Sequence, residues 1–423
     1  MPAPSANGYS PSENGQPAAD STTFREVSEE EVRTTAPDAD EVEMHGAALP
    51  HRYYRRRMLR RNATENAPPV ITPVIQSDTL EGDRSLTRRV RQLLFGKPIA
   101  SAEFEKEHIG VFKALAVLSS DALSSVAYGT EASLAVLVTA GTAEATHNLL
   151  IGLTVVLLLS IVAFSYRQTI FTYPKGGGSY IVAKDNLNVN FGLIAASALM
   201  IDYVLTVSVS VSAGVLALVA PFPALSPFKV VIGVVLILLL MLVNMRGVSE
   251  SGSLFAAPTY LFVGSFLFMI LIGIVKALFS GGLFHALPPA PTNIAVSGHL
   301  SIFLILTAFS SGCSAMTGTE AISDGVPIFR KPQSTNAAKT LLIMAVVLGT
   351  MYAGTTYLAW RYGISPQANG EPTLTFQMAT IFFSGWFRWF TLIFQFATTL
   401  ILVLAANTSF DDFPRLSMFL ARD

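Results

Sequence analysis

The sequence has 423 residues, of which 51% are hydrophobic and only 13% are charged, and its mean hydropathy is +0.49. This composition is typical of an integral membrane protein and excludes an ordinary soluble domain. The formal net charge is -1, and the single cysteine, Cys313, excludes a disulfide framework or a metal site built from cysteines.

The polar residues are concentrated before residue 111. Residues 1–83 are rich in Pro, Ser and acidic residues and cannot bury enough surface to fold alone, so we expect a disordered cytoplasmic tail. Its basic run at residues 51–61 is interpreted as a solvated segment that helps to set membrane topology. The alternatives are binding to anionic lipid or to nucleic acid, and of these we do not expect nucleic acid as a partner. Residues 84–110 are amphipathic and predict a juxtamembrane segment.

Residues 111–406 contain eight apolar stretches and form the predicted transmembrane core. Each stretch is close to the roughly 20 residues that a helix needs to cross the hydrocarbon of a bilayer. The predicted spans are residues 111–141, 148–166, 190–220, 228–245, 253–280, 300–323, 338–360 and 386–406. Residues 374–385 predict a shorter amphipathic piece, and residues 407–423 a cytoplasmic loop.

The loops predict the orientation of the chain. With the N-terminus inside, the inner loops and tail hold more Lys and Arg than the outer loops. The positive-inside rule favours that arrangement. We therefore expect a multi-pass protein of the cell membrane whose N-terminus is cytoplasmic.

The first predicted span contains an unusual polar stretch at residues 119–131, which includes Asp121, Tyr128 and Glu131. A carboxylate near the bilayer centre costs at least about 2.5 kcal/mol, so it should face a cavity and a partner. Serine and glycine at such depth can leave the helix where the freed backbone lines a water-filled site. We therefore expect a broken helix that carries a binding site.

A second polar stretch interrupts the sixth span. Residues 310–320 begin with two serines and end in Gly-Thr-Glu, as residues 119–131 do. Matching interrupted segments in two halves of a chain indicate a transporter built from inverted repeats, with its substrate bound where the breaks meet. The alternative is a chance match between two helices rich in small residues. The acids within the spans argue against chance.

Three of these acids are expected to converge. Asp121 and Asp202 both lie near mid-membrane, at 1.5 Å of rise per residue, and Glu320 follows the break in the sixth span. Thr206 and Ser210 share a helix face with Asp202, although such hydroxyls also bond to their own helix. Oxygen ligands without an intramembrane Lys or Arg suit an alkali cation, a proton or a cationic amine. Like charges held close cannot all ionise, so at least one carboxyl is expected to be protonated in the empty site.

No motif predicts an enzyme. The histidines show no His-x-x-x-His spacing, and Gly176–Gly178 lacks the full phosphate-binding pattern. We therefore expect neither catalysis nor a cofactor.

From residue 113 onward, the chain resembles the amino acid, polyamine and organocation transporter superfamily and, within it, the KimA-type potassium importers. The broad resemblance rests on the Tyr-Pro-Lys-Gly-Gly-Gly-Ser-Tyr motif at 173–180 and on Asn-Met-Arg-Gly at 244–247. The closer resemblance rests on residues 119–128, Asp202 with Tyr203 and Thr206, residues 311–327 and residues 407–416.

This resemblance implies an all-α, LeuT-like inverted-repeat fold with broken helices 1 and 6. It also implies secondary active import of potassium by proton symport, through alternating access of spans 1, 2, 6 and 7, in a homodimer within the lipid bilayer. The potassium ligands would be Asp121, Tyr128, Asp202, Thr206, Thr317 and Glu320. Glu320 is our choice for the proton carrier, and Glu131 would line the access route.

Two features of the sequence keep alternatives open. Amino-acid carriers of this superfamily have a Gly-rich break in span one, where this chain places Asp121, which would repel a substrate carboxylate. A permease for amino acids is therefore the weaker hypothesis, and a polyamine carrier lies between the two. The inverted-repeat core also needs about ten spans, so we expect either a fragment of a longer importer or a truncated, non-transporting membrane protein.

Overall fold

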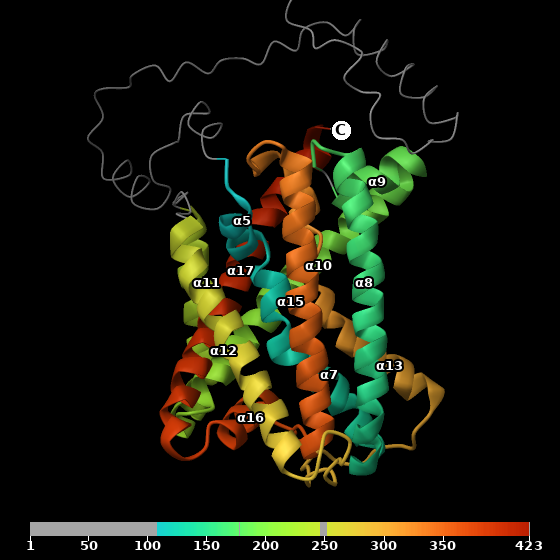
Figure 1. The fold of residues 1–423 in the computed structure, drawn as a ribbon. Coiled ribbons are helices and arrows are strands. Elements are labelled where there is room, and N and C mark those ends of the chain that lie inside the picture. The colour runs from blue at the N-terminus through green and yellow to red at the C-terminus, as the bar shows by residue number, and fades with distance from the viewer. Residues whose placement is uncertain (1–107, 177, 246–251, 423) are drawn as a thin grey trace, which may run out of the picture. The chain divides into compact units, whose positions relative to one another are not determined.

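The computed structural model describes residues 108–176, 178–245 and 252–422. In these residues the secondary structure is helical apart from one isolated parallel bridge between Ile109 and Phe329 (Figure 1). The expectations for residues 1–83, including the basic run, and for nearly all of the juxtamembrane segment fall outside the described residues.

Seven helices of the described chain are long and apolar enough to cross a membrane. They correspond to predicted spans two to eight, which confirms those spans as apolar helices. The main helices are α8 (Asn148–Thr172), α10 (Val189–Val219), α11 (Lys229–Met245), α12 (Gly252–Phe279), α13 (Ile302–Gly312), α15 (Gln333–Tyr362) and α17 (Phe390–Arg422).

Shorter helices connect these elements. They are α9 (Gly178–Asn186), α16 (Leu374–Phe382) and the 3-10 helices Val138–Ala140, Thr142–His147, Pro223–Phe228, Cys313–Met316, Val326–Ile328 and Gly385–Trp389. Helix α16 corresponds to the short piece expected at residues 374–385.

The long helices turn apolar side chains outward. Leu157 of α8, Leu205 of α10 and Leu238 of α11 are all exposed. An apolar surface of this extent is characteristic of contact with lipid rather than water.

The first predicted span is not one continuous helix. It consists of α5 (Val111–Leu118), α6 (Ser120–Ser124) and α7 (Val126–Leu137). Ser119, between the first two segments, leaves the helical conformation with φ -111° and ψ 2°. The first span is accordingly not among the seven membrane-crossing helices given above.

The sixth span is interrupted after α13. Its chain passes through the 3-10 helix at residues 313–316, becomes extended at Thr317 and turns at Gly318, where φ is +76°. It then re-enters a helix in α14 (Ala321–Asp324). Glycine suits residue 318 because a positive φ is costly for other residues.

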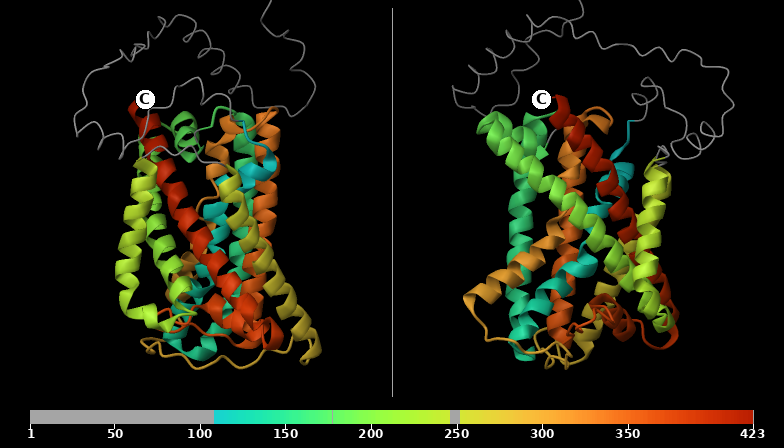
Figure 2. Two further views of the ribbon diagram at one scale, coloured as in Figure 1. Left: turned by 90° about the vertical axis from the view of Figure 1, so that its left-hand side faces the viewer. Right: turned by 180° about the vertical axis from the view of Figure 1, so that it is seen from behind.

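The interrupted spans pack against each other inside the helix assembly. Helix α13 contacts α7, α15 packs along α8, and α10 packs along α17 (Figure 2). Phe262 and Phe266 of α12 and Phe394 of α17 are fully buried in the core beside them. The packing brings two polar stretches, distant in sequence, into contact.

Helix α17 corrects one prediction. The sequence analysis places a loop at residues 407–423, whereas the helix continues to Arg422. The segment before Pro414 contains no other proline and no glycine, and Asp412 and Arg415 form an ion pair of 2.9 Å one turn apart. Polar residues are compatible with a helix, so their appearance after an apolar span does not mark its end.

Candidate functional site

The two interruptions lie against each other at Asp121 and Gly318. A Cβ atom placed on Gly318 would be 2.5 Å from Asp121 Oδ2, so the turn in the sixth span reaches the carboxylate directly. One helical turn further along, the Ser125 hydroxyl donates a hydrogen bond of 2.7 Å to the Ala315 carbonyl. Gly129 also packs closely on Ala315. The breaks therefore form one joint structure.

The Asp121 carboxylate is buried and has few partners that would offset the cost of burying its charge. Its side chain is 4% exposed, and its Oδ1 atom has no hydrogen-bond partner among the described residues. Asp202, Glu320 and Asp412 are close enough to interact with it electrostatically. Burying charge without pairing is costly. A cation placed beside Asp121 would relieve that cost.

Glu320 is held by three hydroxyl groups from three helices. Tyr166 of α8, Ser179 of α9 and Tyr203 of α10 each donate to its carboxylate at 3.3 Å. Tyr166 and Ser179 are also 3.0 Å apart. Ser179 lies in the motif at residues 173–180 that carries the broad resemblance. Neither that motif nor the apolar sequence around Tyr166 indicates a distant acid as the partner.

The other expected ligands lie around these two acids. Tyr128 of α7 interacts electrostatically with Asp121 and Asp202, and Asp202 also interacts with Glu320. Thr206 is buried one turn along α10 from Asp202. In the sixth span, the Thr317 hydroxyl donates to the Ser314 carbonyl at 2.9 Å, which leaves its oxygen lone pairs as acceptors.

The acids do not form a compact carboxylate site. Across the described parts of the chain, no group of three or more His, Cys, Asp or Glu side chains is arranged to hold a metal ion. A cation bound at Asp121 would therefore need hydroxyl and backbone oxygens besides carboxylates, which is the usual environment of a weakly hydrated cation.

Two further acids lie beside Asp121, Asp202 and Glu320, which together are called the acid cluster. Neither of the two was given a role from the sequence. Asp412 of α17 is buried and paired with Arg415. The Asp324 carboxylate packs on Gly178, at the start of α9. Asp412 lies in one of the motifs that carry the family resemblance. This motif could have indicated a role for Asp412. Residues 407–423 were expected to be a loop, however, so Asp412 was not considered for the site.

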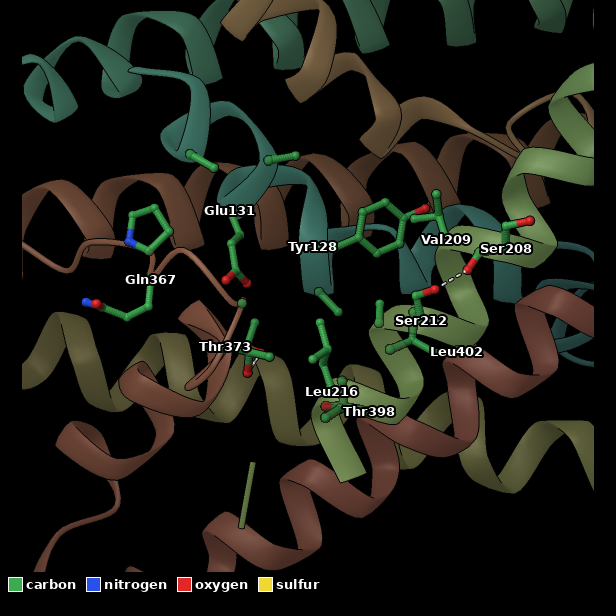
Figure 3. Close-up of a pocket in the computed structure, with 18 of the residues that line it drawn as sticks. Tyr128, Glu131, Ser208, Val209, Ser212, Leu216, Gln367, Thr373, Thr398 and Leu402 are labelled. Atoms are coloured by element: carbon green, nitrogen blue, oxygen red, sulfur yellow. Dashed lines mark hydrogen bonds between the residues drawn. The ribbon is translucent and has the colours of Figure 1, made fainter. Parts of the chain in front are cut away.

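Glu131 stands apart from this cluster. Its Oε2 atom accepts a hydrogen bond of 3.0 Å from the Leu374 amide, at the start of α16. Glu131 and Tyr128 both line a cavity of about 480 Å³ between α7, α10, α17 and the segment before α16 (Figure 3). The cavity therefore borders the acid cluster at Tyr128.

Comparison with known proteins gives two matches. Residues 109–423 match the amino acid permease family. The chain is also 45% identical, over 334 residues, to the potassium transporter KimA of Bacillus subtilis strain 168. That alignment covers 79% of this chain and 54% of the relative, so the chain spans about half the length of the protein it matches.

Proposed function

The chain belongs to the amino acid permease family, and on this premise we propose that it is a secondary transporter that imports potassium ions. The family is one of membrane transporters, so the expectation that the chain is not an enzyme is confirmed. Seven apolar helices agree with a multi-pass membrane protein. The 45% sequence identity to a potassium transporter supports potassium as the cargo.

The observation that carries the proposal is the contact between Gly318 and Asp121. It places a buried carboxylate at the meeting point of two interrupted spans, where transporters of inverted-repeat construction bind their cargo. An ionised Asp121 at this position would favour a cation over a substrate carboxylate.

We assign potassium binding to oxygen atoms from both interrupted spans and from α10. Carboxylate and hydroxyl oxygens can replace the hydration shell of a potassium ion. The proposed ligands are Asp121, Tyr128, Asp202, Thr206, Thr317 and Glu320. Because the three carboxylates are not grouped to hold a metal ion among the described residues, binding would have to draw them closer together.

Proton symport is assigned to Glu320. Three hydroxyls donate to its carboxylate, an arrangement that favours the ionised form. In a symporter the proton and the potassium ion are bound together, so protonation of Glu320 would lower the negative charge of the occupied site while Asp121 and Asp202 keep the potassium ion. Opening of the site to the cytoplasm would then release both.

The transport cycle would use alternating access within a LeuT-like inverted-repeat fold. The moving part would consist of the two interrupted spans together with α8 and α15. It would move against the remaining helices. Such rocking exposes a central site to each side of the membrane in turn. We place the protein in the lipid bilayer of the cell membrane, as a homodimer with its N-terminus in the cytoplasm.

A permease for amino acids or polyamines is the second candidate, because the matching family is described as amino acid permeases. An amino-acid substrate would bring a carboxylate beside Asp121, whereas a polyamine would bring only positive charge. The buried acid therefore disfavours the amino acid more than the polyamine. The third alternative is a membrane protein without transport activity.

Growth of a bacterium that lacks its own potassium uptake systems tests the function. The protein is expressed from its full natural reading frame, and growth is measured at limiting potassium. Rescue is expected, without inhibition by added arginine or putrescine. Absence of rescue, with the protein detected in the membrane, would overturn the proposal, and uptake of labelled arginine or putrescine would favour a permease.

A further inference from the structure

The cavity beside Glu131 is large for a metal ion. Its volume of about 480 Å³ lies within the range of roughly 300–1,000 Å³ that is usual for small-molecule sites. Ser212 and Leu216 of α10 and Leu402 of α17 form one wall, opposite Tyr128 and Glu131 (Figure 3). A cavity of this size can hold an occupant with several carbon atoms.

The walls offer few polar groups that are free to donate. Most of the lining residues are Ala, Val, Leu or Pro. The hydroxyls of Ser208, Ser212 and Thr398 donate to carbonyls of their own helices. Their oxygens keep lone pairs that can accept, so the wall does not exclude a cation. The apolar side chains between them would also contact the carbon atoms of an organic occupant.

Glu131 gives the cavity its charge. It is the only charged residue among the described residues that line the cavity, and its side chain extends into it (Figure 3). No described Lys or Arg forms an ion pair with Glu131. Lys229 is paired with Glu371 at 2.8 Å. Apart from the Leu374 amide, which donates to Oε2, the carboxylate has no described partner and can accept a cation in the cavity.

Tyr128 adds an aromatic surface. Its ring lines the same cavity one turn before Glu131 on α7. The face of an aromatic ring attracts ammonium groups, with a gain of about 0.5–2 kcal/mol depending on how far the site is desolvated. A carboxylate, an aromatic ring and apolar walls together recognise one class of ligand.

We propose that this cavity binds an organic ammonium ion, with the charge beside Glu131 and Tyr128 and the carbon substituents against the apolar walls. The occupant would also obstruct the route to the acid cluster, because Tyr128 borders both. That second consequence rests on the proposed potassium transport, whereas the binding itself does not.

Binding of radiolabelled tetrapropylammonium to the purified full-length protein tests the inference. We expect saturable binding that falls at least about tenfold in Glu131→Gln, which corresponds to a loss of about 1.4 kcal/mol. Glu144→Gln is the matched control, since that carboxylate pairs with His147 outside the cavity, and it should bind as the wild type does. Absence of saturable binding to the wild type would overturn the proposal.

A second pair of variants separates the cavity from the acid cluster. Ala132→Phe should abolish binding by filling the cavity while leaving the Glu131 to Leu374 hydrogen bond in place. Asp121→Asn should retain binding. Loss of binding in Asp121→Asn together with normal binding in Glu131→Gln would place the probe at the acid cluster and contradict the inference.

The effect of the probe on transport is measured in a separate experiment. Tetrapropylammonium should inhibit rubidium uptake by the wild type, and Glu131→Gln should relieve that inhibition. If the probe binds at Glu131 but leaves uptake unchanged, the proposed obstruction of the route is wrong and the proposed binding site stands. If the wild type shows no uptake at all, the proposed function fails, and the binding result stands on its own.

Discussion

Gly318 lies directly against the carboxylate of Asp121, in a backbone conformation with φ +76° that side chains disfavour. The contact joins the interruption of the sixth span to that of the first. Because the two breaks are interlocked, the proposed transport cycle would move both spans together.

A side chain at residue 318 should therefore disrupt the site. In Gly318→Ala, the new Cβ atom would collide with Asp121, and the positive φ would add a cost of about 1–2 kcal/mol. We expect potassium uptake to fall at least about tenfold, the change that 1.4 kcal/mol produces. Rubidium uptake by cells, normalised to protein in the membrane, measures the effect.

Gly264→Ala is the matched control for that variant. Gly264 lies within α12, and a Cβ atom placed there would meet no other atom within 4 Å. Normal uptake is expected. If Gly318→Ala transports as well as Gly264→Ala does, the close contact at Asp121 is not important for transport.

The positions of the interruptions could be predicted because they depend on local features. An acid such as Asp121 or Glu320 is conspicuous in an apolar stretch and implies a polar environment. The contact of Ser125 with Ala315 could not be predicted in the same way. It joins residues separated by 190 positions, and no local pattern specifies how two such segments pack.

The hydroxyls around Glu320 give a second prediction. Tyr203→Phe removes one donor from the carboxylate, and a hydrogen bond to a charged group contributes about 1.5–3 kcal/mol. We expect reduced potassium uptake and a changed dependence of uptake on external pH, measured in the same cells. The protein should still reach the membrane in normal amounts.

Tyr357→Phe provides the comparison for Tyr203. Its hydroxyl donates to the Leu283 carbonyl in a loop remote from the acids, so transport and its pH dependence should be unchanged. A Tyr203→Phe protein with the pH profile of the wild type would show that this hydroxyl does not influence the coupling step.

A third prediction concerns stability. Arg361 is fully buried at the end of α15 and donates to the carbonyls of Gly282 at 3.1 Å and Ser280 at 2.7 Å. Each such charged hydrogen bond contributes about 1.5–3 kcal/mol. Arg361→Met should therefore lower the midpoint of thermal unfolding in detergent, while Arg388→Met, at an exposed site, should not. Equal midpoints would show that Arg361 does not stabilise the loop after α12.

Other features lay beyond sequence reasoning for definite physical reasons. Helix α17 continues past the apolar stretch to Arg422, because a helix requires backbone hydrogen bonds and not apolar side chains. Tyr166 and Ser179 contact Glu320 only through the packing of α8 and α9. Tyrosine is common near membrane surfaces, so its presence in a span does not predict such a role.

The central claim is that Asp121 binds a transported potassium ion. Rubidium uptake into proteoliposomes that contain the purified full-length protein tests it most directly, with Glu144→Gln as the carboxylate control. We expect uptake by the wild type and by Glu144→Gln, and uptake by Asp121→Asn no greater than that of empty vesicles. Uptake by Asp121→Asn at the level of the wild type would contradict it.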